Sequence, residues 1–276
     1  MNRAKKTPTS KGKVLGLLFA FVAVVALILG FTVFNPFNSN STTNQVAETT
    51  TTKTTEQGIK YSPSQEEKEY LANRFAQLKG VNSEAIAYVY APGTELDEPV
   101  VQTSDNSTYL DKTFEGGNQP FLGTVFMDMD NKKDFSDRLT WLFGHARGSK
   151  VPDHRMFKDV NYFSRQEYFD EHPYVVIETP ERKYYYEVTG VKVVHEDTKL
   201  YQIPSASDKK ENFISMFKEG SRNWLENSKI SGEDNMTVFA TCRLDDVSLR
   251  TLVLARQVPD NELKEFLEKN KELLNS

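Results

Sequence analysis

Eight short segments between residues 85 and 258 most constrain how this chain can fold. They are rich in β-branched and aromatic residues and are bounded by Gly, Pro, Asn or Asp, which is typical of β-strands. About eight strands joined by short turns favour a closed barrel or a sandwich. We therefore predict a mainly β domain. The predicted strands are residues 85–92, 99–102, 121–128, 139–145, 174–179, 183–196, 236–242 and 249–258.

Helical spacing of apolar residues appears in four other segments. Ser64 and Glu67 have the S-x-x-E form of a capping box, so we predict an amphipathic helix over residues 64–79, ended by Gly80. Less regular patterns predict helical pieces around residues 153–169 and 208–226. A C-terminal helix is predicted over residues 261–274.

The N-terminal part of the chain has the pattern of a membrane anchor. Residues 1–13 contain Lys and Arg but no acidic residue, and the 21 residues 14–34 carry no charge. At about 1.5 Å per residue this run can cross a hydrocarbon core of about 30 Å. The basic flank predicts a cytoplasmic N-terminus and an extracellular remainder. A cleaved signal peptide is the alternative, but the run ends in Phe34-Asn35-Pro36-Phe37, which is a poor cleavage site.

Composition divides the rest of the chain into a spacer and a folded part. Thr, Ser and Asn dominate residues 35–60, and such a segment buries too little surface to fold, so we expect a flexible spacer. Residues 61–258 form the predicted folded domain and residues 259–276 a C-terminal helical segment. Removing the five basic residues before position 38 leaves 34 − 5 = 29 Lys and Arg against 39 Asp and Glu. A net charge near −10 argues against a nucleic-acid partner.

Cys242 is the only cysteine in the chain and ends the apolar strand MTVFATC. A single cysteine excludes a disulfide within the chain, and on an extracellular domain it leaves a free thiol. A buried structural cysteine is the common alternative. A side chain at a strand end, however, can emerge from a rigid framework into a loop-built site.

A thiol nucleophile needs a proton acceptor and a stabiliser of the oxyanion. His145 ends another apolar strand, after Gly144, whereas the other three histidines have the pattern of surface residues. Arg250 lies eight residues after Cys242, on the next predicted strand. Arg243 and Arg256 are alternatives to it. No spacing typical of a metal site or of a nucleotide-binding loop is present, so no cofactor is expected.

These residues, in this order, resemble the sortases. The resemblance rests on the strand ending in Gly144-His145, on Ala240-Thr241-Cys242, and on an arginine in the following strand. Further stretches between residues 64 and 258 resemble class B of that family. They are Asn82-Ser83-Glu84, Pro92-Gly93-Thr94, Pro99-Val100-Val101-Gln102, Thr108-Tyr109-Leu110, Gly123 to Asp128 and Met156-Phe157-Lys158-Asp159.

The resemblance implies an eight-stranded sortase β-barrel with an N-terminal helical extension and a helix before the cysteine strand. It also implies a transpeptidase in which Cys242 is the nucleophile, His145 the general acid and base, and Arg250 the stabiliser of the oxyanion. Leu110, Ala240 and Thr241 are expected to bind substrate.

The partners implied are surface proteins or pilins that carry a C-terminal sorting motif cleaved after Thr. The acceptor would be an amine of a cell-wall precursor or a pilin Lys. A hydrolytic thiol peptidase and an inactive membrane-tethered scaffold or adhesion domain stay open as alternatives.

Overall fold

The computed structural model describes residues 60–119, 122–146, 156–203 and 210–274. The predicted basic tail, the membrane anchor and nearly all of the spacer lie outside these residues. In the part of the chain that is described, no helix is both long and apolar enough to cross a membrane.

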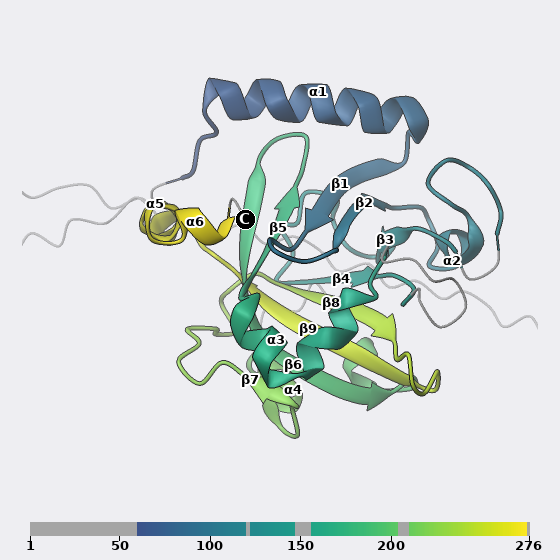
Figure 1. Ribbon diagram of the computed structural model, residues 1–276, viewed down its shortest axis with the longest axis vertical. Helices are drawn as coiled ribbons and strands as arrows, with labels where there is room; N and C mark the ends of the chain where they lie inside the picture. Colours follow the sequence, from purple (N-terminus) through teal and green to yellow (C-terminus); the bar gives the residue numbers. More distant parts are fainter. Residues whose placement is uncertain (1–59, 120–121, 147–155, 204–209, 275–276) are drawn as a thin grey trace, which may run out of the picture. The chain divides into compact units, whose positions relative to one another are not determined.

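Eight strands form a closed barrel with both antiparallel and parallel pairings (Figure 1). Along the sheet the order is β5-β1-β2-β3-β4-β8-β9-β6, and pairing of β6 with β5 closes the ring. The sequence pattern allowed a barrel or a sandwich, and the structure is a barrel. The strands are β1 (Ala85–Tyr90), β2 (Asp97–Val101), β3 (Val125–Met127), β4 (Leu139–Phe143), β5 (Tyr174–Glu178), β6 (Lys183–His195), β8 (Met236–Cys242) and β9 (Leu249–Gln257).

Two pairings decide where the strand ends meet. β4 and β8 are parallel, with Phe143 opposite Ala240. Two residues further along each chain segment are His145 and Cys242, so both follow the last paired position of β4 and β8 at the same end. β8 and β9 are antiparallel, and their register places Cys242 opposite Arg250.

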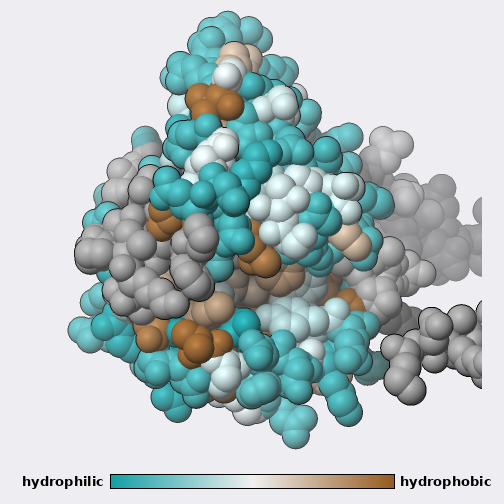
Figure 2. Space-filling view, turned by 90° about the vertical axis from the view of Figure 1, so that its right-hand side faces the viewer, coloured by the Kyte–Doolittle hydropathy of each residue, from teal (hydrophilic) through white to brown (hydrophobic). Residues whose placement is uncertain are grey.

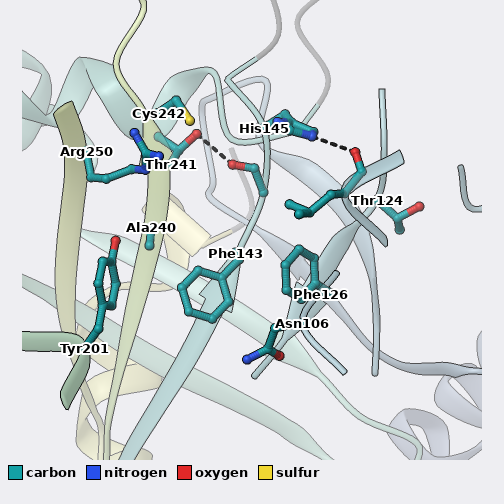
Figure 3. A pocket seen from close by; sticks show the side chains of 12 residues that line it. Asn106, Thr124, Phe126, Phe143, His145, Tyr201, Ala240, Thr241, Cys242 and Arg250 are labelled. Atoms are coloured by element: carbon teal, nitrogen blue, oxygen red, sulfur yellow. Dashed lines mark hydrogen bonds between the residues drawn. The ribbon is translucent and has the colours of Figure 1, made fainter. Parts of the chain in front are cut away.

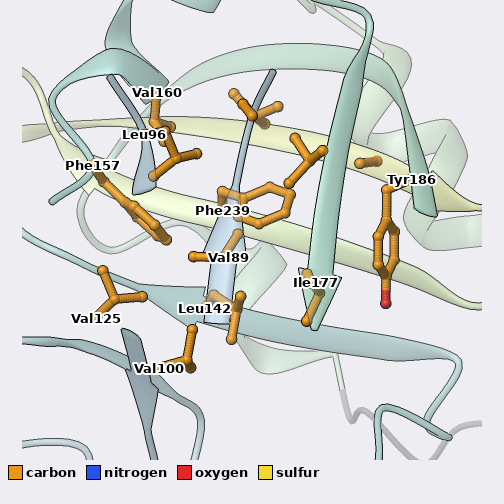
Figure 4. Close-up of a cluster of buried hydrophobic side chains, with 14 of the residues drawn as sticks. Val89, Leu96, Val100, Val125, Leu142, Phe157, Val160, Ile177, Tyr186 and Phe239 are labelled. Carbon is orange, nitrogen blue, oxygen red and sulfur yellow. The ribbon is translucent and has the colours of Figure 1, made fainter. Parts of the chain in front are cut away.

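The strands beside the site are buried on both faces. Leu142 and Phe239 point into the barrel interior, where they join the cluster shown in Figure 4. The neighbouring residues Trp141 and Val238 point to the opposite face of the same strands and belong to a second cluster, with Phe213. Because strand side chains alternate between faces, this double burial explains why β4 and β8 read as nearly continuous apolar runs.

The helices cover the barrel and differ in detail from the sequence prediction. Ser64 Oγ accepts a hydrogen bond from Glu67 N at 3.1 Å, so the predicted N-terminal cap is present, but the helix runs through Gly80 to Val81. The helical elements are α1 (Gln65–Val81), α2 (Thr108–Asp111), η1 (Asp159–Ser164), α3 (Gln166–Glu171), η2 (Lys199–Gln202), α4 (Glu211–Lys218), α5 (Asp260–Lys269) and α6 (Lys271–Leu274).

The helix predicted over residues 208–226 is the largest difference. α4 ends at Lys218, and Gly220 follows with a φ of 68°, a backbone conformation that terminates helices. The next residues form the two-residue strand β7 (Asn223–Trp224), which pairs with β6. A Cβ on Gly190 would lie 2.6 Å from the Trp224 ring, so this glycine in β6 leaves room for the indole.

Candidate active site

All six side chains proposed from the sequence line one cleft of about 230 Å³. Figure 3 shows Cys242 and His145 facing each other across its upper part, with Arg250 beside the cysteine. On the space-filling view, hydrophobic residues gather around a hollow between hydrophilic regions (Figure 2). The six residues are Leu110, His145, Ala240, Thr241, Cys242 and Arg250.

Cys242 is the last residue of β8 and is partly exposed. The peptide group that follows it is held on the N–H side, because Arg243 N donates to Leu249 O at 3.0 Å. The thiol therefore stands at the point where a rigid strand pair gives way to a loop. This position gives a nucleophile a fixed backbone and access to solvent.

His145 is held in one orientation by a backbone carbonyl. Its Nε2 lies 2.7 Å from Leu110 O, at the end of α2. A carbonyl oxygen can only accept a hydrogen bond, so this contact assigns the ring proton to Nε2. In the neutral ring the basic nitrogen is then Nδ1, which is the nitrogen available to exchange a proton with a reacting group.

The guanidinium of Arg250 is fixed by three hydrogen bonds. Nη1 donates to Val247 O at 2.7 Å and to Leu249 O at 3.0 Å. Nη2 donates to Glu196 Oε2 at 2.8 Å. Of the five N–H groups of an arginine, this leaves the Nε–H and one Nη2–H without a partner among the described residues. These two donors can serve a carbonyl or an oxyanion bound in the cleft.

The two alternative arginines are bound elsewhere and do not line the cleft. Arg243 forms a bidentate pair with Asp245, with both N–O distances at 2.6 Å. Arg256 is 5% exposed and pairs with Asp234 at 3.1 Å and Glu262 at 2.9 Å. The geometry therefore favours Arg250 as the arginine next to Cys242.

The three predicted substrate contacts differ in what they can offer. Leu110 is 41% exposed at the rim, whereas Ala240 and Thr241 are buried. The Thr241 hydroxyl donates to Gly144 O at 2.7 Å (Figure 3). That hydroxyl therefore links the strand carrying Cys242 to the residue before His145.

The sequence analysis did not assign the other residues that line the cleft to a site. Phe126 and Phe143 pack together with ring centroids 5.4 Å apart and give the cleft an apolar wall. Phe143 is two positions before His145 in an alternating strand, and this spacing could have identified it. The six residues are Asn106, Thr124, Phe126, Phe143, Gly144 and Tyr201.

Tyr201 enters the cleft from η2, far from the catalytic strands in sequence. Burial raises the pKa of Tyr201 to about 12, against an opposing effect of the Arg250 charge and with a smaller increase from Cys242. The phenol therefore stays neutral at physiological pH and can donate a hydrogen bond.

No cluster of three or more potential metal ligands occurs within the described residues. The acidic pair after Cys242 is engaged locally, because Asp245 binds Arg243 and Asp246 accepts hydrogen bonds from Ser248.

Comparison with known proteins finds similarity to class B sortases. Sortase B of Listeria monocytogenes is 27% identical over 169 residues, which is 60% of this chain and 65% of that protein, slightly under two thirds of its length. A cysteine-to-serine mutant of Clostridium perfringens sortase B matches with a TM-score of 0.64 and 24% identity, covering 71% of this chain and 91% of that one.

A Streptococcus pyogenes class B sortase involved in pilus biogenesis matches with a TM-score of 0.60 and 25% identity, over 67% of this chain and 98% of the other. No protein-family model matches the chain. The resemblance drawn from the sequence motifs is confirmed by the sequence similarity to Sortase B, and the predicted sortase barrel is confirmed by the structural matches.

Proposed function

Because the chain has the sequence similarity and the fold of the class B sortases, we propose that it is a cysteine transpeptidase acting on C-terminal sorting motifs. Cys242 is the nucleophile, His145 the general acid and base, and Arg250 the stabiliser of the oxyanion. The observation that carries the proposal is the meeting of these three side chains in one cleft.

In the first half of the reaction, the Cys242 thiol gives its proton to His145, and Sγ bonds to the carbonyl carbon of the Thr in the sorting motif. The C–N bond breaks, and the leaving amine takes a proton from His145. In the second half, an acceptor amine attacks the thioester and gives its proton to His145. A new amide forms, and the cysteine sulfur leaves and takes the proton back from His145. Covalent catalysis of this kind replaces one difficult amide exchange by two easier steps.

Arg250 supplies the positive charge that the negatively charged intermediate needs. Arg250 lies beside Cys242 because the β8–β9 register makes the two residues cross-strand neighbours, and its two remaining N–H groups are available to that intermediate. Hydrogen bonds to Glu196 and to two carbonyls hold the guanidinium in place before the substrate arrives. Such preorganisation is what makes an oxyanion donor effective.

The proposed substrates are surface proteins or pilins with a C-terminal sorting motif, and the proposed acceptor is a cell-wall amine or a pilin Lys. Relatives support this substrate class, because solved structures include a Staphylococcus aureus sortase B–substrate complex and a sortase B complexed with triglycine. The Streptococcus pyogenes neighbour supports a pilus role. Comparing oligoglycine with a Lys-containing peptide as the acceptor distinguishes wall anchoring from pilin polymerisation.

Membrane anchoring through residues 14–34 belongs to the same proposal, with the catalytic domain outside the cell. Its support is the uncharged apolar run and its basic flank. Cell fractionation of the full chain, and of a version lacking residues 14–34, tests it. Recovery of both proteins in the same soluble fraction would contradict the anchor.

The catalytic assay uses sorting-motif peptides with and without an added amine, and scores ligated and hydrolysed products separately. We expect Cys242→Ala to abolish both products and Arg250→Ala to lower kcat by about 100-fold. Arg243→Ala is the matched control, because it removes a neighbouring arginine that does not line the cleft.

Three results would change the assignment. Loss of activity in Arg243→Ala but not in Arg250→Ala would move the oxyanion role to the other arginine. Hydrolysis without ligation, whatever the amine, would indicate a thiol peptidase. An intact fold with no cleavage of any sorting-motif peptide would support the inactive scaffold.

A further inference from the structure

One short segment donates hydrogen bonds to the backbone carbonyls of His145 and Cys242. Phe157 N donates to His145 O at 3.0 Å. Four residues later, Asn161 Nδ2 donates to Cys242 O at 3.0 Å, across a sequence separation of 81 positions. We call residues 156–161 the brace. It begins eleven positions after His145 in the sequence.

The brace is anchored in the barrel interior. Met156, Phe157 and Val160 are each at most 2% exposed and belong to the main core cluster (Figure 4). Met156 has a φ of 68°, a strained value for a residue other than glycine, and its N–H donates to the Glu98 carboxylate. A segment packed in this way can fix the position of whatever it binds.

Asn161 is itself held by a buried hydrogen bond. Its side chain is 7% exposed, and Oδ1 accepts from Thr251 Oγ1 at 2.8 Å. Thr251 is fully buried on β9, next to Arg250. The amide of Asn161 is therefore oriented by β9 so that its N–H₂ group faces the Cys242 carbonyl. The peptide group after Cys242 is thus bound on both sides, by Asn161 and by Leu249 O.

We propose that Asn161 is a positioning residue, and that the brace sets the relative placement of Cys242 and His145. The inference rests on the proposed function and extends it to a residue outside the cleft. His145 lies two positions after the end of β4, and Cys242 is the last residue of β8. Both come after the last pair between these two strands, Phe143 and Ala240. Pairing of these two strands alone therefore does not fix them, and the brace supplies further contacts.

A small displacement of either side chain has a large kinetic effect. A misplacement of about 1 Å at a reacting centre can lower turnover about 100-fold. Loss of one hydrogen bond at the Cys242 carbonyl allows this strand end to move, so we expect Asn161→Ala to lower kcat about tenfold or more. KM is expected to stay within about twofold, because Asn161 does not line the cleft.

Asn223→Ala is the matched control. Asn223 is also 7% exposed, and its Nδ2 donates to Phe163 O at 2.7 Å. Asn223→Ala therefore loses the same kind of buried hydrogen bond, from a side-chain amide to a backbone carbonyl of η1. Asn223 itself has no hydrogen bond to Cys242 or His145. We expect the two variants to lower Tm similarly, whereas only Asn161→Ala lowers kcat. Equal kcat values for the two variants would overturn the proposal.

A second pair of variants covers the case in which Asn161→Ala does not fold. Thr251→Val is nearly isosteric and removes the hydroxyl that orients Asn161, whereas Thr251→Ser retains it. We expect Thr251→Val to lower kcat and Thr251→Ser to preserve it within about twofold. If both variants retain full kcat, the orientation of Asn161 by Thr251 has no role in catalysis, and the proposal fails.

Alkylation of Cys242 separates failure of this inference from failure of the proposed function. The chain has one cysteine, so the rate of reaction with iodoacetamide reports on Cys242 alone. We expect this rate at neutral pH to fall about threefold or more in Asn161→Ala, because the Cys242 thiol is no longer held where His145 can take its proton, and to be unchanged in Asn223→Ala. An unchanged or faster rate in Asn161→Ala overturns the brace, even if no sorting substrate is ever cleaved.

Discussion

Gly144→Ala tests how closely the barrel core controls His145. A Cβ at residue 144 would lie 3.0 Å from Phe157 Cγ, 3.1 Å from Phe157 Cδ2 and 3.1 Å from Val125 Cγ2. Ordinary carbon–carbon contacts are about 3.5–4.0 Å. Phe157 and Val125 are both fully buried in the core, so neither can move aside without disturbing its neighbours.

The expected magnitude combines two opposing effects. Overpacking of a dense core costs about 1–3 kcal/mol. Gly144 is not among the glycines with positive φ, so the substitution also gains about 0.4–1 kcal/mol by restricting the unfolded chain. A net loss of about 1 kcal/mol in the free energy of unfolding should lower Tm by about 2–4 °C for a domain of this size.

The assay combines thermal unfolding with peptide-cleavage kinetics. Because Gly144 precedes His145, we expect kcat to fall more than the small loss of stability would explain. Phe157→Leu provides the second test, since a smaller side chain removes the two ring contacts. The double variant should be less destabilised than the sum of the single variants, by about 0.5 kcal/mol or more. Additive losses, or a Gly144→Ala protein with normal Tm and kcat, would refute the steric reasoning.

Three further outcomes follow from the structure. Gly123→Ala should lower the free energy of unfolding by more than about 2 kcal/mol. Gly123 has a φ of 49°, and a Cβ there would lie 2.7 Å from Leu110 O, which is the hydrogen-bond acceptor of His145. A normal unfolding midpoint in urea would contradict this. Arg256→Met should cost about 2–3 kcal/mol in chemical denaturation, because it removes the ion pair of partly buried Asp234 and leaves Glu262 with only the Lys229 ammonium at 3.7 Å. We expect kcat per folded molecule to stay unchanged, and loss of kcat would show that this arginine does affect the cleft. Burial raises the pKa of Glu187 above its ordinary value, so the folded state binds this proton more tightly than the unfolded chain and stability falls as pH rises through the raised pKa. Glu187→Gln should therefore raise Tm at about pH 7 and leave it nearly unchanged at about pH 4; equal shifts at both pH values would exclude this ionisation as the cause.

Local sequence patterns determined most of the strands and the candidate catalytic residues. β6, β8 and β9 were predicted nearly to the residue, because their long β-branched runs are bounded by turn residues. Cys242 and His145 were selected because each ends an apolar strand. The local sequence pattern predicted the wrong secondary structure where tertiary contacts decided the conformation. Residues 223–224 were predicted as helix but form a strand on β6, where Trp224 packs over Gly190.

Only the tertiary structure decided which residues meet. The sequence left three arginines open, and the choice depends on the β8–β9 register, which pairs Arg250 with Cys242. Spacing along the chain cannot reveal that β4 and β8 run parallel, since the residues between them pass through two other barrel strands. Asn161 carried no sequence signal at all, because its hydrogen bond to Cys242 O spans 81 positions. Residue type and periodicity thus identified the groups able to do the chemistry, while long-range pairing determined their geometry.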